Sequence, residues 1–339
     1  MVILKKIYYF ASSFELDIGD KRGYICLISR VIRVAMFFFM LYGGCTFSQN
    51  EQMFSQTSFN PAFINPAYAG SDTGKYYNVI LMNRDQMAGI DMSPGTTVLN
   101  VNGPLNISGI QGGINVTFYD DRLGFLNTPA FNIGYAYKFD IEKGSLGLGL
   151  SAGVFFSTLD SKGWRLPDGD ADPAIPTAKG TKRNFDLGLG AYYKNDRLYA
   201  GLSVTHLIRP SLVYGDNASK LPQNYYLMAG YGITFENLDF ELKPSLLVLT
   251  DLKNVLYSLN SLLFYRNKFW IGLDYRFKSS LGVLAGMNLF PDLKVGYSYS
   301  YNTSLLSRFG GSNHEVMLTY RFLIYLDKGK QKYKSIRYL

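Results

Sequence analysis

Very few side chains in this sequence have the chemistry of catalysis, and their spacing assembles no reaction centre. The chain contains only two histidines, His206 and His314. A hydrolytic site needs a nucleophile, a base and an orienting group within reach of one another, and neither histidine accompanies a motif such as G-x-S-x-G. We therefore expect both imidazoles to form hydrogen bonds at turns or rims, with His314 beside Glu315, and we expect no enzymatic activity.

An acidic run at Asp168–Asp172 places carboxylates at alternate positions, as in the first part of a calcium-binding loop. It lacks the glycine and the closing glutamate that a calcium loop has at fixed offsets, so a solvated loop tip is favoured. The glycines elsewhere lie within periodic stretches rather than ahead of helices, which predicts no phosphate or dinucleotide site. We expect no metal and no cofactor.

The composition excludes two further classes of protein. With 47% hydrophobic and 18% charged residues, the chain is not intrinsically disordered. Its formal net charge is +8, but the lysines and arginines are scattered, whereas nucleic-acid binding needs a clustered basic face. The abundant aromatic residues and glycines suit strands with large side chains on one face and small ones on the other.

The N-terminal stretch is typical of an export leader. Two arginines precede the apolar run Val34–Leu41, which is too short to span a bilayer as a helix. Small residues follow up to Ser48, which predicts cleavage there, with acylation of Cys45 as the alternative. Because Cys26 and Cys45 both lie in the leader, residues 1–48, the mature chain would contain no cysteine chemistry.

The elements that position the remaining side chains show a period of two. The stretch Phe131–Phe139 alternates large apolar residues with small or polar ones, and the same alternation recurs in Leu146–Val154 and Leu293–Asn302. In a strand, successive side chains point to opposite faces. One face of the expected sheet is therefore apolar, and the other is small or polar.

Three features favour a membrane barrel over a soluble sheet. No long amphipathic helix is available to cover the apolar face, the strands reach the ~9–11 residues that a tilted strand needs to cross a bilayer, and tyrosine and phenylalanine crowd the strand ends. Closure satisfies the backbone polar groups in lipid. The sequence thus predicts an all-β fold, a transmembrane antiparallel β-barrel of about 14 strands over residues 75–326, preceded by the signal peptide and followed by a basic tail at 327–339.

The connections between the expected strands alternate in length. Long ones are expected at Asp85–Gly95, Asp120–Asn127, Asp160–Lys182, Arg209–Pro222 and Thr303–Ser312, with modest ones on the same side at Asp251–Asn254 and Lys278–Ser280. Short ones are expected at Asn102–Asn106, Asp140–Gly144, Asn195-Asp196, Glu236–Leu238, Arg266-Asn267 and Pro291-Asp292. Because bacterial barrels have short periplasmic turns and longer outer loops, we expect both chain ends in the periplasm of an outer-membrane protein.

The small or polar face would line the interior of the barrel. Its charges are expected from Lys138, Lys194, Asp274, Arg276 and Arg321. Such an interior suits an aqueous channel, and it equally suits a lumen filled by a plug or by a partner segment. The pattern leaves these readings open.

An ordered set of segments resembles the PorP/SprF family of type IX secretion system outer-membrane proteins from Bacteroidetes. The resemblance covers about Gln49 to Phe322 and rests on Phe54–Ser71 (FSQTSFNPAFINPAYAGS), Asn83–Gln86 (NRDQ), Tyr199–Leu207, Phe269–Arg276, Val295–Tyr299 and Gly311–Glu315. The family-motif and interaction residues that it implies are Asn65, Pro66, Ala67, Tyr68, Ala69, Gly70, Arg84, Gln86, His314 and Glu315.

The resemblance implies an outer-membrane component that aids export or surface attachment of a secreted partner such as an adhesin. Its other partners would be periplasmic and outer-membrane secretion components and membrane lipid, but no nucleic acid. The segment 49–74, which carries NPAYAGS, would lie in the periplasm for contacts with the machinery. A porin-like channel for small solutes is the alternative.

Overall fold

The computed structural model describes residues 53–71, 75–105, 111–141, 143–159, 180–214, 217–235, 238–303 and 311–323. The predicted leader, the Asp168–Asp172 run and the basic tail at 327–339 lie outside these residues. Within the described residues, no helix is both long and apolar enough to cross a membrane. They belong to one compact unit, Ser48–Leu339, and strands make up most of it.

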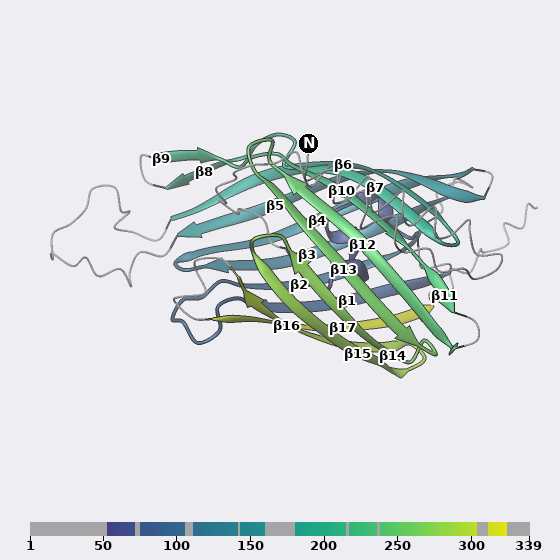
Figure 1. The fold of residues 1–339 in the computed structure, drawn as a ribbon. Helices are drawn as coiled ribbons and strands as arrows, with labels where there is room; N and C mark the ends of the chain where they lie inside the picture. The colour runs from purple at the N-terminus through teal and green to yellow at the C-terminus, as the bar shows by residue number, and fades with distance from the viewer. Residues whose placement is uncertain are drawn as a thin grey trace, which may run out of the picture. The chain divides into compact units, whose positions relative to one another are not determined.

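Fourteen antiparallel strands form a closed wall (Figure 1). β1 (Tyr76–Asp85) pairs with β17 (Ser312–Leu323), and the other strands follow in chain order around the ring. They are β2 (Gly95–Pro104), β3 (Gly112–Leu123), β4 (Leu126–Ile141), β5 (Gly144–Leu159), β6 (Gly180–Asn195), β7 (Leu198–Thr205), β10 (Asn224–Tyr231), β12 (Phe240–Thr250), β13 (Val255–Tyr265), β14 (Phe269–Arg276), β15 (Ser280–Phe290) and β16 (Leu293–Asn302). Because β10 bonds to both β7 and β12, the ring closes without an open edge.

The alternation predicted from the sequence appears on the two faces of this wall. In β4, Phe131 and Ile133 are each 45% exposed, whereas Ala130 and Ala136 are buried. In β5, Leu150 is exposed, and the glycines beside it face the interior. An apolar outer face on a ring without open edges is the arrangement that lipid requires. The chain therefore has the architecture of an outer-membrane β-barrel, as predicted.

The longest connections all lie at one end of the barrel. At the long-loop end, β5 and β6 are joined by residues 160–179, and residues 206–223 between β7 and β10 carry a separate hairpin of β8 (Ser211–Tyr214) and β9 (Asn217–Lys220). At the short-turn end, residues 196–197 join β6 to β7, and residues 291–292 join β15 to β16. A further short strand, β11 (Ile233–Phe235), continues β10 along β12.

Two predicted connections are wrong. At Asp120–Asn127 the sequence predicts a long loop, but β3 and β4 continue through it and turn at Gly124, whose φ of +59° is the left-handed conformation that permits a tight turn. At Asn102–Asn106 the sequence predicts a turn, but β2 continues to Pro104. Asn102 is fully buried in that strand and donates a hydrogen bond to Asn100 at 3.1 Å. Its polarity marks the inner face of the wall rather than a loop.

The barrel interior is filled by residues 53–71, which we call the plug. Its short 3-10 helices are η1 (Thr57–Phe59), η2 (Pro61–Phe63) and η3 (Pro66–Tyr68). The sequence predicts the segment 49–74 in the periplasm, outside the wall. The described part of that segment instead packs into two apolar clusters with inward side chains, because the small residues of the inner face leave space that its prolines and aromatic rings occupy. A plug from the chain itself thus occupies much of the interior.

Candidate functional site

The plug is built from a repeated Asn-Pro-Ala-aromatic sequence. Asn60 and Asn65 each precede a proline that begins a 3-10 turn, where its fixed φ suits the first helical position. Only at the second repeat does the side chain cap the turn, as Asn65 Oδ1 accepts the backbone N–H of Ala67 at 3.0 Å. The two copies therefore share a sequence but differ in how firmly their turns are held.

Asn65 also bonds the plug to the barrel wall. Its Nδ2 donates to the backbone oxygen atoms of Ala191 in β6, at 3.1 Å, and of Leu202 in β7, at 3.3 Å. Beside it, Ser203 Oγ donates to the Ile64 carbonyl at 2.7 Å. With both ends of its amide engaged, Asn65 is fully buried and hydrogen-bonded, as a buried amide needs to be.

Inward-facing glycines let the plug backbone approach the wall closely. A Cβ at Gly147 or Gly149 in β5 would collide with the backbone of Ala67, and a Cβ at Gly113 in β3 would collide with the Ala69 carbonyl. In each case the obstacle is the backbone of the plug, which has no flexible end to move aside. These glycines are required for close approach rather than for their conformational freedom.

The final residues of the motif complete this end of the plug. Gly70 has φ +66°, and a Cβ there would lie 2.8 Å from the Gly103 carbonyl oxygen of β2. The Tyr68 ring meets Tyr192 of β6 edge-on, with centroids 5.2 Å apart. Burial raises the pKa of the Tyr68 hydroxyl, so this phenol remains neutral in the interior. The predicted residues Asn65, Pro66, Ala67, Tyr68, Ala69 and Gly70 thus form one packed turn inside the barrel.

The opposite end of the plug is held by buried charges. Glu315 of β17 accepts the backbone N–H of Ser55 at 2.9 Å and 2.8 Å through its two oxygens, and that of Gln56 at 3.2 Å. Arg84 Nε lies 3.4 Å from the same carboxylate, and Arg276 Nη2 lies 4.0 Å from it. A carboxylate that accepts backbone N–H groups and faces two guanidinium groups is a charge-assisted anchor.

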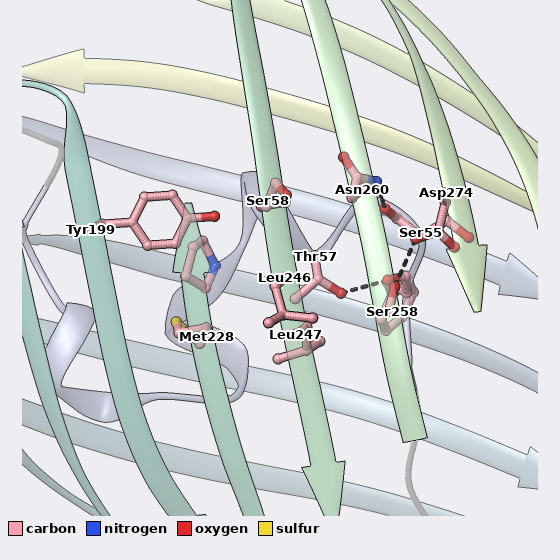
Figure 2. A pocket seen from close by; sticks show the side chains of 13 residues that line it. Ser55, Thr57, Ser58, Tyr199, Met228, Leu246, Leu247, Ser258, Asn260 and Asp274 are labelled. Atoms are coloured by element: carbon pink, nitrogen blue, oxygen red, sulfur yellow. Dashed lines mark hydrogen bonds between the residues drawn. The ribbon is translucent and has the colours of Figure 1, made fainter. Parts of the chain in front are cut away.

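A second carboxylate balances the second arginine. Asp274 Oδ2 lies 3.2 Å from Arg276 Nε, so two cations face two anions in this cluster. Arg276 also donates to Ser55 Oγ at 3.0 Å, and Asn260 donates to the Ser55 carbonyl at 3.1 Å. Figure 2 shows Ser55 among side chains of β13 and β14 that include Asn260 and Asp274. The cavity that the plug forms with β7, β10 and β12–β14 measures about 30 Å³, the scale of single water molecules.

The four predicted residues outside the plug fall into three groups in the structure. Arg84 and Glu315 meet, because they are register partners across the seam between β1 and β17. Gln86 does not join them, since it follows β1 and its backbone N–H donates to the Pro94 carbonyl at 2.8 Å. His314 points to the outer face, where Tyr297 Oη lies 2.6 Å from its Nδ1. Neighbours in sequence, His314 and Glu315 lie on opposite sides of the wall.

Asp274 and Arg276 lie in the interior, as predicted, but no sequence pattern connects them with Arg84 and Glu315. Ser55 was not predicted as a site residue, although the cluster converges on its backbone and side chain. The alternation of side chains in β14 by itself predicts that both charged residues point inward. Which strands stand opposite each other depends on ring closure, and no local pattern reports it.

Solved structures with a similar barrel come from several bacterial proteins. They include the Acinetobacter baumannii outer membrane protein Omp33, with 8% identity, a TM-score of 0.45, and coverage of 74% of this chain and 100% of that chain. The Ralstonia pickettii toluene transporter TbuX has 12% identity, a TM-score of 0.47, and coverage of 77% and 92%. The translocator domain of the autotransporter NalP from Neisseria meningitidis has 12% identity, a TM-score of 0.42, and coverage of 80% and 96%. Scores this low carry no functional argument.

A search of curated proteins gave no significant match. The family comparison is decisive, because the model of the type IX secretion system membrane protein PorP/SprF matches residues 46–320. This range includes the whole plug, every wall strand from β1 to β16, and most of β17. The chain belongs to the PorP/SprF family of type IX secretion system membrane proteins.

Proposed function

We propose that this protein aids the export or surface attachment of a secreted partner, such as an adhesin, as an outer-membrane component of the type IX secretion system. Family membership supports the secretion setting. The observation that carries the proposal is the plug, which occupies the interior and is held at both ends by buried contacts. A lumen that a plug obstructs suits a barrel that acts through its loops and rims rather than by conducting solutes.

The proposed role is non-enzymatic. The buried Glu315 carboxylate is committed to the plug backbone and to Arg84. His314 bonds to Tyr297 on the outer face, and His206 Nδ1 lies 2.9 Å from the Asp186 carboxylate. Structural hydrogen bonding accounts for the positions of these groups.

The secreted partner is proposed to bind at the long-loop end. We assign this end to the cell surface because bacterial barrels keep their short turns in the periplasm. Its connection at residues 206–223 carries the β8–β9 hairpin, a sheet separate from the wall. A loop element held by a rigid ring is a common site of recognition.

Replacement of residues 211–220 by a short Gly-Ser linker tests this assignment. Display of the secreted partner, measured by surface labelling of intact cells, should be lost, while the barrel keeps its heat-dependent gel shift. The matched control replaces Asp251–Asn254, a modest connection at the same end, and should retain display. Normal display after loss of the hairpin would contradict the assignment.

Planar-bilayer recording of the purified mature protein tests the filled lumen directly. Steady conductance should be absent, because hydrogen bonds to the wall at both ends of the plug hold it in the path of ions. A stable open conductance in the unmodified protein would instead favour the small-solute channel. Copurification of a large secreted protein from gently solubilised membranes would favour the secretion role.

A further inference from the structure

The plug leaves one part of the interior open. At the short-turn end, a cavity of about 620 Å³ lies between the plug and the inner face of the wall, and we call it the vestibule. The plug contributes Ser58, Phe59 and Tyr68 to its lining. This volume lies within the range of sites that hold small molecules or peptide segments.

The vestibule carries an excess of positive charge. Its cations are Lys194, Arg197, Lys243, Lys294 and Arg321, and its carboxylates are Asp196, Glu241 and Asp292. Two of the carboxylates are already paired, since Glu241 lies 3.0 Å from Lys243 and Asp292 lies 3.1 Å from Arg321. The local field therefore favours an anion.

Lys294 of β16 is the cation that lacks compensation. It forms no salt bridge with any residue that the structure describes. Lys243 and Arg321 both repel its ammonium group, and Lys243 also repels Lys194. These four cations are therefore close enough to interact with one another. A partly buried ammonium group with cationic neighbours gains more from an added carboxylate than an exposed lysine does.

A hydroxyl group lies directly beside this lysine. Thr319 of β17 is the register partner of Lys294, so both side chains project from adjacent strands into the vestibule. The Thr319 Oγ1 atom is buried and has no hydrogen-bond partner among the described residues. An ammonium group and an unused hydroxyl donor side by side can bind the two oxygens of one carboxylate.

We propose that the vestibule binds an acidic peptide segment, with a carboxylate held between Lys294 and Thr319. A peptide fits better than a lipid headgroup, because the cavity lies inside the ring and not on the outer face. Asparagine side chains at Asn78, Asn195 and Asn267 offer amide groups for a peptide backbone, and aromatic rings offer apolar contact. This site is independent of the long-loop end and of the role proposed for it.

Fluorescence anisotropy with the purified mature protein in detergent tests the proposal, using a fluorescein-labelled hexaglutamate peptide as the probe. Saturable binding should weaken as salt rises, and a hexaglutamine peptide should not bind. Lys294→Gln should weaken binding at least about tenfold, Thr319→Val should weaken it by a smaller factor, and Lys294→Arg should retain it. Lys253→Gln, which removes an exposed charge at the opposite end, is the matched control and should bind as the unmodified protein does.

Each variant should keep its heat-dependent gel shift, which separates a lost site from a lost fold. Equal binding of the two peptides, or unchanged binding by Lys294→Gln, would overturn the proposal. Displacement of the probe by inorganic phosphate at concentrations where free glutamate has no effect would indicate a small-anion site and would also overturn it. Competition by vesicles of anionic lipid, but not by acidic peptides, would overturn it in favour of a headgroup site.

Discussion

The two ends of the plug are held in different ways. At Ser55 and Gln56, the buried Glu315 carboxylate and Arg276 bind the plug through directed, charge-assisted contacts, and Arg84 pairs with the same carboxylate. At Ala67 and Ala69, glycines of the wall admit the plug backbone by leaving out side chains. The Ser55 end depends on charged side chains of the wall, and the Ala67 end depends on wall positions that have no side chain. A conservative change is therefore tolerated differently at the two ends.

Removal of the Glu315 carboxylate should cause the largest loss of unfolding free energy. Glu315→Ala leaves the buried Arg84 without its ion-pair partner and frees the N–H groups of Ser55 and Gln56, so we expect a loss of about 3–5 kcal/mol in unfolding free energy. Guanidinium unfolding in detergent measures it. Glu241→Ala removes a partly exposed partner of Lys243 and should cost less than about 1 kcal/mol. Equal costs would contradict the anchor.

A side chain at the glycine end should have the next largest effect. Gly149→Val places atoms where the Ala67 backbone lies, and we expect a loss of about 1–3 kcal/mol with displacement of the plug. Trp270 reports that displacement, because its ring centroid lies 5.2 Å from that of Phe59 in the plug. Its fluorescence should shift toward longer wavelength. The measurement uses a Trp164→Phe background, so that Trp270 is the one tryptophan left. Gly180→Val, where a Cβ meets nothing within 4 Å, is the control.

The two asparagines of the repeat differ in how strongly they should hold the glycine end of the plug. Asn65→Ala removes a cap and two bonds to the wall, so we expect it to cost about 1–2 kcal/mol. Asn60→Ala removes one weak contact, to the Met82 sulfur at 3.8 Å, and should cost less. The same unfolding measurement ranks the two variants. The reverse order would show that the first repeat, not NPAYAGS, holds the plug.

The smallest change in unfolding free energy is expected on the outer face of the wall. His314→Ala removes a hydrogen bond to Tyr297 on the outer face, and unfolding free energy should change by no more than about 0.5 kcal/mol. Its neighbour Glu315 is the most sensitive position proposed. A large cost for His314→Ala, with Trp270 fluorescence unchanged, would show that the outer face contributes independently of the plug.

Much of the wall was predictable because its signal is local. Alternation of side chains in β4, β5 and β16 indicates the two faces of each strand without reference to any other strand. The prediction of Asp120–Asn127 as a loop was wrong because polar residues mark strand ends as well as loops. The same ambiguity hid Asn102, whose amide serves the interior.

The plug was not predictable as an interior element. Its sequence has no strand period, and its 3-10 turns are too short to carry a hydrophobic pattern. A segment rich in asparagine and proline is typical of an exposed linker, and only the matching absence of side chains at Gly113, Gly147 and Gly149 makes room for it inside. That match joins positions far apart in the chain.

By itself, the sequence determined the two faces of the wall, the number of strands and the family, because each depends on the order of neighbouring residues. The tertiary structure decided where the plug lies and which charges meet. Ser55 and Glu315 are 260 positions apart, and they touch because the ring closes between β1 and β17. Closure also separates His314 from Glu315, since a strand sends adjacent side chains to opposite faces and only the closed ring makes one of those faces the interior.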